Sequence, residues 1–263
     1  MDLVEVQRMR VARSRADLAL APGETVIGGG TWLFSEPQPG VTGVVDLSGL
    51  GWEPVTELPD GGVSVAATCT LARLRDAAPA FGEAASLVPQ LVDALLGSWK
   101  IHRVATVGGN ICLALPAGPM TSLAAGLGAT ALVWSADGGE RRIPVAALVT
   151  GVRETELVPG DVLRAIEFPP SPDWVAHRRA SLAPLGRSAA LVVARIRGDG
   201  FHLAVTASTA APRVFSFLGL PSATQLAEAV EGCDWYDDAH GAPDWRRAIT
   251  LAFAEELRQE VLA

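Results

Sequence analysis

Residues 103–118 read Arg-Val-Ala-Thr-Val-Gly-Gly-Asn-Ile-Cys-Leu-Ala-Leu-Pro-Ala-Gly, and this stretch decides how the rest of the chain is interpreted. The adjacent Gly108 and Gly109 allow positive φ and leave successive backbone N–H groups uncovered by Cβ atoms. Such a run of donors suits an anion, most often a phosphate. Thr106 and Asn110 add a hydroxyl and a side-chain amide. Taken alone, however, a Gly-Gly-Asn sequence is usually a tight turn.

A similar glycine segment lies upstream, where residues 26–32 read Val-Ile-Gly-Gly-Gly-Thr-Trp and follow a predicted strand over 24–27. Two such segments, each carrying a threonine and each ending a β-like run, can clamp a pyrophosphate from two sides. The sequence contains neither a G-x-G-x-x-G that opens a helix nor a G-x-x-x-x-G-K-[ST] motif. It therefore gives no support to a Rossmann or a P-loop fold.

The two segments together give the chain a recognisable pattern. It resembles the FAD-binding medium subunit of the molybdenum hydroxylases, the family of xanthine dehydrogenase and carbon monoxide dehydrogenase. Residues 28–33 match the family's Ala-Gly-Gly-Thr-Asp-Leu-like first loop, and residues 106–117 match its Thr-Ile-Gly-Gly-Asn-Ile loop followed by Ser-Pro-Ala. Residues 150–159 are close to the family's Gly-Tyr-Arg-x-Thr-x-Leu-x-Pro. The resemblance covers essentially the whole chain.

The resemblance implies an α+β fold, with a two-subdomain FAD-binding domain of the PCMH type and a small C-terminal domain of antiparallel sheet and helices. We expect the FAD-binding domain over 1–170, with subdomains over about 1–50 and 51–170. The C-terminal domain is expected over 171–263. A cluster of three prolines and a serine at 169–172 independently marks this boundary.

Periodicity, caps and turn signals predict the individual elements. Near the N-terminus we expect a strand over 4–6 and a helix over 11–20. Thr70 is a suitable N-cap for a helix over 71–77, and Asp244 for a C-terminal helix reaching residue 262. Further helices are expected over 89–96, 123–128 and 223–230. Further strands are expected over 41–47, 63–68, 129–135, 141–145, 161–168, 174–181, 189–196, 201–208 and 214–218.

Composition excludes several classes of protein. The 263 residues are 49% hydrophobic, carry a net charge of −8, and include one lysine, Lys100, so nucleic-acid binding is not expected. The sequence has no apolar run long enough to span a bilayer and does not begin with a secretory signal pattern. We therefore expect a cytoplasmic protein that does not associate with membranes.

The three cysteines, Cys69, Cys112 and Cys233, are widely spaced and form no C-x-x-C pair. This spacing predicts neither a zinc site, nor an iron–sulfur cluster, nor a disulfide framework. Cys112 is interpreted as a small buried apolar residue. Any cluster that supplies electrons to this chain must then belong to another polypeptide.

The resemblance also implies the site residues. Backbone N–H groups of both glycine segments would hold the FAD pyrophosphate, and the Thr31 and Thr106 hydroxyls would either bond phosphate oxygens or serve as caps. Leu163 matches an apolar position near the flavin. Arg178 matches a basic residue near the isoalloxazine ring, an ordinary surface arginine being the alternative. No catalytic residue and no metal ligand is expected. The expected cofactor-binding residues are Ile27, Gly28, Gly29, Gly30, Thr31, Trp32, Thr106, Val107, Gly108, Gly109, Asn110, Leu163 and Arg178.

Three positions depart from the family's pattern. Trp32 stands where the family usually has Asp, so its ring would pack either against the cofactor or in the core. Pro119 stands where relatives carry an acidic residue that contacts the cofactor, and it has neither a side-chain acceptor nor an N–H. Val152 replaces the family's Tyr.

The function implied by the resemblance is that of an FAD-carrying electron-transfer subunit of a molybdopterin-dependent hydroxylase or dehydrogenase. It would be an oxidoreductase subunit, active only with its partners, that relays electrons from [2Fe–2S] clusters on a partner subunit to NAD, oxygen or a quinone. The implied partners are an iron–sulfur subunit and a molybdopterin-binding subunit, in a heterotrimer that dimerises. The alternatives are a stand-alone FAD oxidoreductase of the same fold and a flavin-free scaffold subunit.

Overall fold

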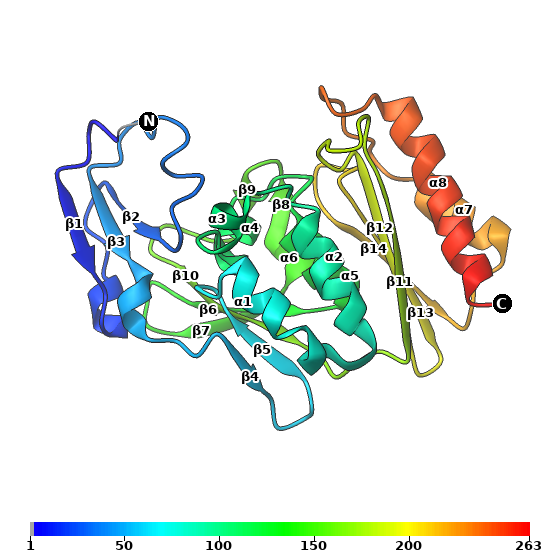
Figure 1. The fold of residues 1–263 in the computed structure, drawn as a ribbon, viewed down its shortest axis with the longest axis horizontal. Helices are drawn as coiled ribbons and strands as arrows, with labels where there is room; N and C mark the ends of the chain where they lie inside the picture. The colour runs from blue at the N-terminus through cyan, green and yellow to red at the C-terminus, as the bar shows by residue number, and fades with distance from the viewer. Residues whose placement is uncertain (1–2) are drawn as a thin grey trace.

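Three of the four β-sheets within residues 3–263 follow one another along the longest axis of the molecule, with helices between and beyond them (Figure 1); the fourth is the small pair β8–β9. The computed structural model describes residues 3–263. A three-stranded sheet lies at the N-terminal end, a five-stranded sheet occupies the middle, and a four-stranded sheet with the last two helices forms the C-terminal end (Figure 1). The expected α+β fold is therefore confirmed.

The N-terminal sheet consists of β1 (Arg8–Val11), β3 (Gly43–Asp46) and β2 (Glu24–Ile27), in that spatial order. Both pairings are parallel. Because β3 lies between the other two strands, its Val44 and Val45 side chains are buried. The strand predicted over 24–27 is confirmed residue for residue.

The predictions for the first twenty residues are wrong. The strand lies at 8–11 rather than 4–6, and residues 11–20 contain one 3₁₀ turn, η1 (Arg15–Leu18), instead of a helix. Ser14 caps this turn, because its backbone N–H and hydroxyl both donate to the Asp17 carboxylate. The Arg10 side chain then donates to the carbonyl oxygens of Asp17 and Ala19, which are oxygens that a continuing helix would use internally.

The middle sheet is antiparallel throughout and pairs strands from distant parts of the chain. Its helices begin where the sequence offers caps: the Thr70 hydroxyl accepts from Arg73 N at 3.3 Å, as predicted for the helix that follows. In spatial order the strands are β4 (Val55–Glu57), β5 (Val63–Ala66), β10 (Val162–Phe168), β6 (Thr130–Trp134) and β7 (Glu140–Pro144). The helices packed near it are α1 (Leu71–Asp76), α2 (Leu87–Asp93), α4 (Val107–Cys112) and α5 (Pro119–Leu127).

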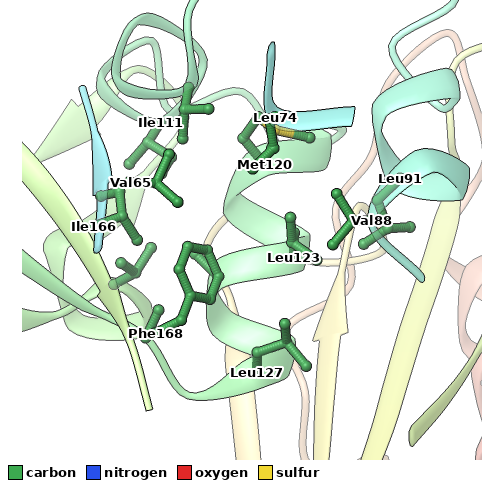
Figure 2. Packing of buried hydrophobic residues seen from close by; sticks show 14 of the residues in the cluster. Val65, Leu74, Val88, Leu91, Ile111, Met120, Leu123, Leu127, Ile166 and Phe168 are labelled. Atoms are coloured by element: carbon green, nitrogen blue, oxygen red, sulfur yellow. The ribbon is translucent and has the colours of Figure 1, made fainter. Parts of the chain in front are cut away.

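Helix α5 is the centre of the largest hydrophobic core, and every one of its residues is buried. Figure 2 shows Leu123 of this helix lying between the side chains of the middle sheet on one side and those of α2 on the other. Such all-round burial requires small or apolar side chains on every face, which the sequence 119–127 supplies. The helix starts at Pro119, where the missing N–H costs no hydrogen bond.

The C-terminal sheet is an antiparallel meander, as predicted. Side chains of its second strand, β12, alternate between the two faces of the sheet: Leu191 and Val193 join the core around α5, whereas Val192 and Ala194 join a second core under the last helices. The strands are β11 (Trp174–Ala180), β12 (Ala190–Arg197), β13 (Gly200–Thr206) and β14 (Arg213–Leu218). The helices are α7 (Ala223–Glu231) and α8 (Pro243–Glu260).

Helix α8 does not use Asp244 as its N-cap, contrary to the prediction. The cap is Ala242, and the helix begins at Pro243, whose fixed φ and missing N–H suit the first helical position. Asp244 lies in the first turn, where a carboxylate is favourable for the helix dipole. The domain boundaries near residues 50 and 170 stay predictions, since the core around α5 continues from the middle sheet into β12.

None of the helices within residues 3–263 is long and apolar enough to cross a membrane.

Short elements connect the layers described above. The remaining elements are η2 (Leu47–Leu50), η3 (Ala78–Ser86), α3 (Trp99–His102), α6 (Val145–Leu148), β8 (Val149–Gly151) and β9 (Glu154–Thr155).

Candidate cofactor site

A cavity of about 760 Å³ lies where the N-terminal sheet, the middle part and the C-terminal part meet. Its size is typical of small-molecule and cofactor sites. Both glycine segments border it, although some eighty residues of sequence separate them. The expected residues that line it are Ile27, Gly28, Gly29, Gly30, Thr31, Trp32, Thr106, Gly108, Gly109, Asn110 and Leu163.

The first glycine segment, residues 28–33, displays free backbone donors. Within residues 3–263, none of its six N–H groups donates a hydrogen bond, and the next one along, Phe34 N, closes a turn on Gly30 O at 2.9 Å. Gly30 has φ of +70°, a conformation that glycine adopts without strain. A row of unpaired N–H groups at the wall of a cavity is a binding surface for an anion such as a pyrophosphate.

The second glycine segment is a helix start and not a loop after a strand. Helix α3 precedes it, and Thr106 is the N-cap of α4, its hydroxyl accepting from Gly109 N at 3.1 Å. Val107 N donates to Cys69 O and Gly108 N to Ala67 O, both at 2.9 Å. Asn110 N donates to Thr106 O at 3.0 Å. These N–H groups are thus engaged within the protein, and the capping alternative for Thr106 is the one that the structure adopts.

The glycines of the two segments also allow the segments to touch. A Cβ atom on Gly29 would lie 1.8 Å from the Val104 carbonyl oxygen, and one on Gly28 would lie 2.8 Å from Thr106 Oγ1. A Cβ atom on Gly108 would lie 2.5 Å from Ala67 Cβ. Gly29 and Gly108 thus allow close approach to a backbone, and Gly28 leaves room for the Thr106 side chain.

Asn110 connects the second segment to α5. Its Oδ1 accepts from Met120 N at 3.0 Å, which satisfies one of the free N–H groups in the first turn of that helix. Pro119, which replaces an acidic residue of the family's pattern, is buried and lines the cavity. At this position the chain supplies an apolar wall where relatives would offer a carboxylate.

The other expected residues divide between wall, core and surface. Leu163 is buried and lines the cavity, and Trp32 lines it with an indole N–H that has no acceptor within residues 3–263. Val107 points into the core around α5 instead. Arg178 of β11 is not brought to the cavity, because its guanidinium donates to Glu256 at 3.0 Å and to Glu260 at 2.7 Å on α8.

Part of the cavity wall comes from the C-terminal part of the chain, which sequence reasoning missed. Its main feature is Arg246, whose side chain is 1% exposed. Arg246 Nη1 donates to Ala207 O at 2.8 Å, Nη2 pairs with the Asp238 carboxylate, and the guanidinium carbon lies 5.3 Å from the Tyr236 ring centroid. The residues contributed from this part are Arg187, Ser188, Ala207, Tyr236, Asp238, His240 and Arg246.

One sequence signal could have revealed Arg246. The buried residues of α8 are Arg246, Thr250, Ala254 and Leu257, which lie on one face of the helix at helical spacing. An arginine on the buried side of an amphipathic helix needs a partner, since an unpaired buried charge is costly. Here the partner is Asp238, which precedes the helix by one short turn.

The cysteines are only partly as expected. Cys112 was predicted to be buried, but it is exposed and lines the cavity. Cys69 is buried, and burial raises the pKa of its thiol to about 12. Within residues 3–263, no group of three or more His, Cys, Asp or Glu side chains is placed to hold a metal ion.

A cavity of this size, bordered by free backbone donors, suits a cofactor that carries phosphate groups. Residues 9–171 match the family model of the FAD-binding domain in molybdopterin dehydrogenase. The chain belongs to this family, and the resemblance drawn from its glycine segments is confirmed. FAD is its cofactor, and the chain is homologous to subunits of oxidoreductases.

Known proteins of this kind share the fold. A chain of quinoline 2-oxidoreductase from Pseudomonas putida 86 is 22% identical, with 100% of each chain covered and a TM-score of 0.79. A chain of the reconstituted CO dehydrogenase from Oligotropha carboxidovorans is 20% identical, with 98% of this chain and 97% of that one covered and a TM-score of 0.80. Xanthine dehydrogenase from Oryza sativa subsp. japonica is 29% identical over 112 residues, which are 38% of this chain and 8% of that protein.

Proposed function

We propose that this chain is the FAD-carrying electron-transfer subunit of a molybdopterin-dependent hydroxylase or dehydrogenase. It would pass electrons from [2Fe–2S] clusters on a partner subunit to NAD, oxygen or a quinone. The observation that carries the proposal is the row of unpaired N–H groups over residues 28–33 at the wall of a cavity of cofactor size. Bound FAD supplies the redox chemistry, and the chain supplies binding, orientation and electrostatics.

Different residues of the cavity would bind the pyrophosphate, supply positive charge and exclude water. The N–H groups of residues 28–33 bind the pyrophosphate, while the engaged second segment forms the rigid wall opposite them. Among residues 3–263, three arginines line the cavity (Arg153, Arg187 and Arg246) against one carboxylate, that of Asp238, so the cavity favours an anionic ligand. Leu163 and Pro119 contribute apolar surface that excludes water.

The proposed function requires two partner subunits. An iron–sulfur subunit would deliver the electrons and a molybdopterin-binding subunit would oxidise the substrate, in a cytoplasmic heterotrimer that dimerises. The substrate pocket would then lie on another chain.

The test is reduction of the purified single chain and of its complex. We expect one FAD per chain that acid treatment releases, so that the linkage is non-covalent. Dithionite should bleach the flavin absorbance, whereas aldehydes and purines should do so only after the partner subunits are added. Rapid bleaching by such a substrate in the single chain would identify a stand-alone oxidoreductase and overturn the proposal.

A further inference from the structure

An exposed apolar surface lies on and beside helix α3. We call residues 96–104 the α3 surface; their large apolar side chains are all at least 37% exposed, and Trp99 is 71% exposed. Monomeric proteins rarely gather exposed large apolar side chains in one short stretch unless that stretch binds something. Leu96 has φ of +57°, an uncommon conformation for a branched residue, in the turn that ends α2. The apolar members are Leu96, Trp99, Ile101 and Val104.

The α3 surface borders the cofactor cavity directly. Ile101 is 37% exposed and lines the cavity, and Gly97 lines it as well. The Val104 carbonyl oxygen is the atom against which Gly29 of the first glycine segment packs. A protein bound to the α3 surface would therefore lie one side chain away from the cofactor.

The two charged side chains of residues 96–104 are basic, whereas the whole chain is acidic; Asp93 at the end of α2, whose charge reaches His102, is paired with Arg75. From Ala94 to Ala136 the sequence contains no Asp or Glu, whereas the full chain has 29 acidic residues and a net charge of −8. The charged residues in that stretch are Lys100 and Arg103, and both are exposed on the α3 surface. The guanidinium carbon of Arg103 lies 4.6 Å from the Trp99 ring centroid, which holds the indole and a cation side by side.

We propose that the α3 surface docks the electron-donating [2Fe–2S] partner, through a face of that partner with an apolar centre and a carboxylate rim. The proposal rests on the proposed function. Tryptophan and arginine are the residues that most often dominate binding energy at protein interfaces. The local positive charge selects an acidic partner and speeds its encounter. Contact at this place puts the donor against the wall of the FAD site, which is where electron delivery requires it.

The experiment isolates the complex with a tagged chain expressed in its natural source together with its partners. Iron, acid-labile sulfide and FAD are measured per chain, and the [2Fe–2S] signature is recorded by electron paramagnetic resonance. Trp99→Glu and Lys100→Glu change the α3 surface at two residues that do not line the cavity. Leu218→Glu is the matched control, since Leu218 is 94% exposed on β14.

We expect Trp99→Glu to weaken retention of iron by roughly tenfold or more, the effect of losing a central interface residue. Lys100→Glu should weaken it less, and added salt should weaken the wild-type complex. FAD per chain should equal the wild-type value in both variants, which also shows that they fold. Leu218→Glu should behave as wild type.

Three outcomes would overturn the proposal: full iron retention in Trp99→Glu, equal loss in Leu218→Glu, or a complex in which the α3 surface holds a second copy of this chain. A wild-type chain that carries FAD but never copurifies with iron would instead contradict the proposed function. The two failures are thus distinguishable.

Discussion

The two glycine segments look alike in sequence and do different things in the structure. Residues 28–33 keep their N–H groups free at the cavity wall, whereas the N–H groups of residues 107–110 donate hydrogen bonds to Cys69, Ala67 and Thr106. In the second segment, glycine serves close packing, and Gly108 lies against Ala67 where any side chain would collide. A glycine pair therefore encodes either displayed donors or close approach, and only the neighbouring elements decide between them.

The difference is sharpest at Gly29, where close approach and donor display coincide. Gly29→Ala places a methyl group 1.8 Å from the Val104 carbonyl oxygen, so the two segments must separate and the donor row must move. We expect the purified variant to lose nearly all of its FAD, measured as the ratio of flavin to protein absorbance. Gly232→Ala is the control, because its Cβ would meet only one atom, at 3.9 Å. Full FAD content in Gly29→Ala would contradict the assignment of residues 28–33 as the pyrophosphate-binding segment.

Gly108→Ala tests whether the second segment acts through packing. Its Cβ would approach Ala67 Cβ to 2.5 Å in the core, and overpacking of this kind costs about 1–3 kcal/mol of unfolding free energy. We expect a lower midpoint in chemical denaturation of the FAD-free protein. A variant that lost FAD affinity while its stability stayed at the wild-type value would show that the segment binds the cofactor directly.

Thr106→Ala separates capping from phosphate binding. Removing the hydroxyl that accepts from Gly109 N should destabilise the protein by about 1 kcal/mol, and Thr106→Ser should restore most of it. The change in FAD dissociation constant, measured by fluorescence titration, should be small beside that of Gly29→Ala. If Thr106→Ser restored stability but not affinity, the methyl group would have to be part of the binding surface.

The smallest effect concerns pH and the strand that carries the first segment. Glu24 of β2 accepts from Arg10 Nη2 at 2.8 Å and from Ala21 N at 2.9 Å, and these contacts lower its pKa from 4.5 to about 2. Because the folded pKa is the lower one, this stabilisation is complete above pH 4.5 and is lost as the pH falls toward 2.

Glu24→Gln should therefore reduce thermal stability at neutral pH and flatten its decline between pH 4.5 and 2. Thermal unfolding across that range measures it, with Glu57→Gln on β4 as a control at an exposed position. An acid decline as steep in Glu24→Gln as in the wild type would assign the pH dependence to other carboxylates.

Elements with local signals could be predicted from the sequence. The strand at 24–27 and the Thr70-capped helix α1 depend on alternation and on a cap three residues away, and both appear as predicted. The stretch 11–20 could not, because Arg10 and Asp17 redirect its backbone through side-chain contacts that a periodicity count does not see. The prediction for the start of the second segment failed for the same reason, since its partners Ala67 and Cys69 lie in the turn after β5.

The candidate site shows the same division. The glycine segments and Leu163 could be proposed as site residues from the sequence, because they match the family's pattern. Arg178 was misplaced because sequence alone does not show that α8 presents Glu256 and Glu260 to it. Arg246 was missed because its helical spacing with Thr250, Ala254 and Leu257 was not recognised as a buried face. Its position on the cavity also depends on how α8 packs against the C-terminal sheet, which is a long-range contact.

The long sequence separations within this site also set an order of events in time. Strand β5 pairs with β10, about a hundred residues later, and the cavity wall runs from Thr25 to Arg246. Contacts between such distant residues form slowly, after local helices and hairpins. The chain must therefore be synthesised through α8 before the cavity is complete. FAD then binds only to molecules that have folded completely. Since FAD binds the native state and not the unfolded chain, the same event draws the late folding steps to completion.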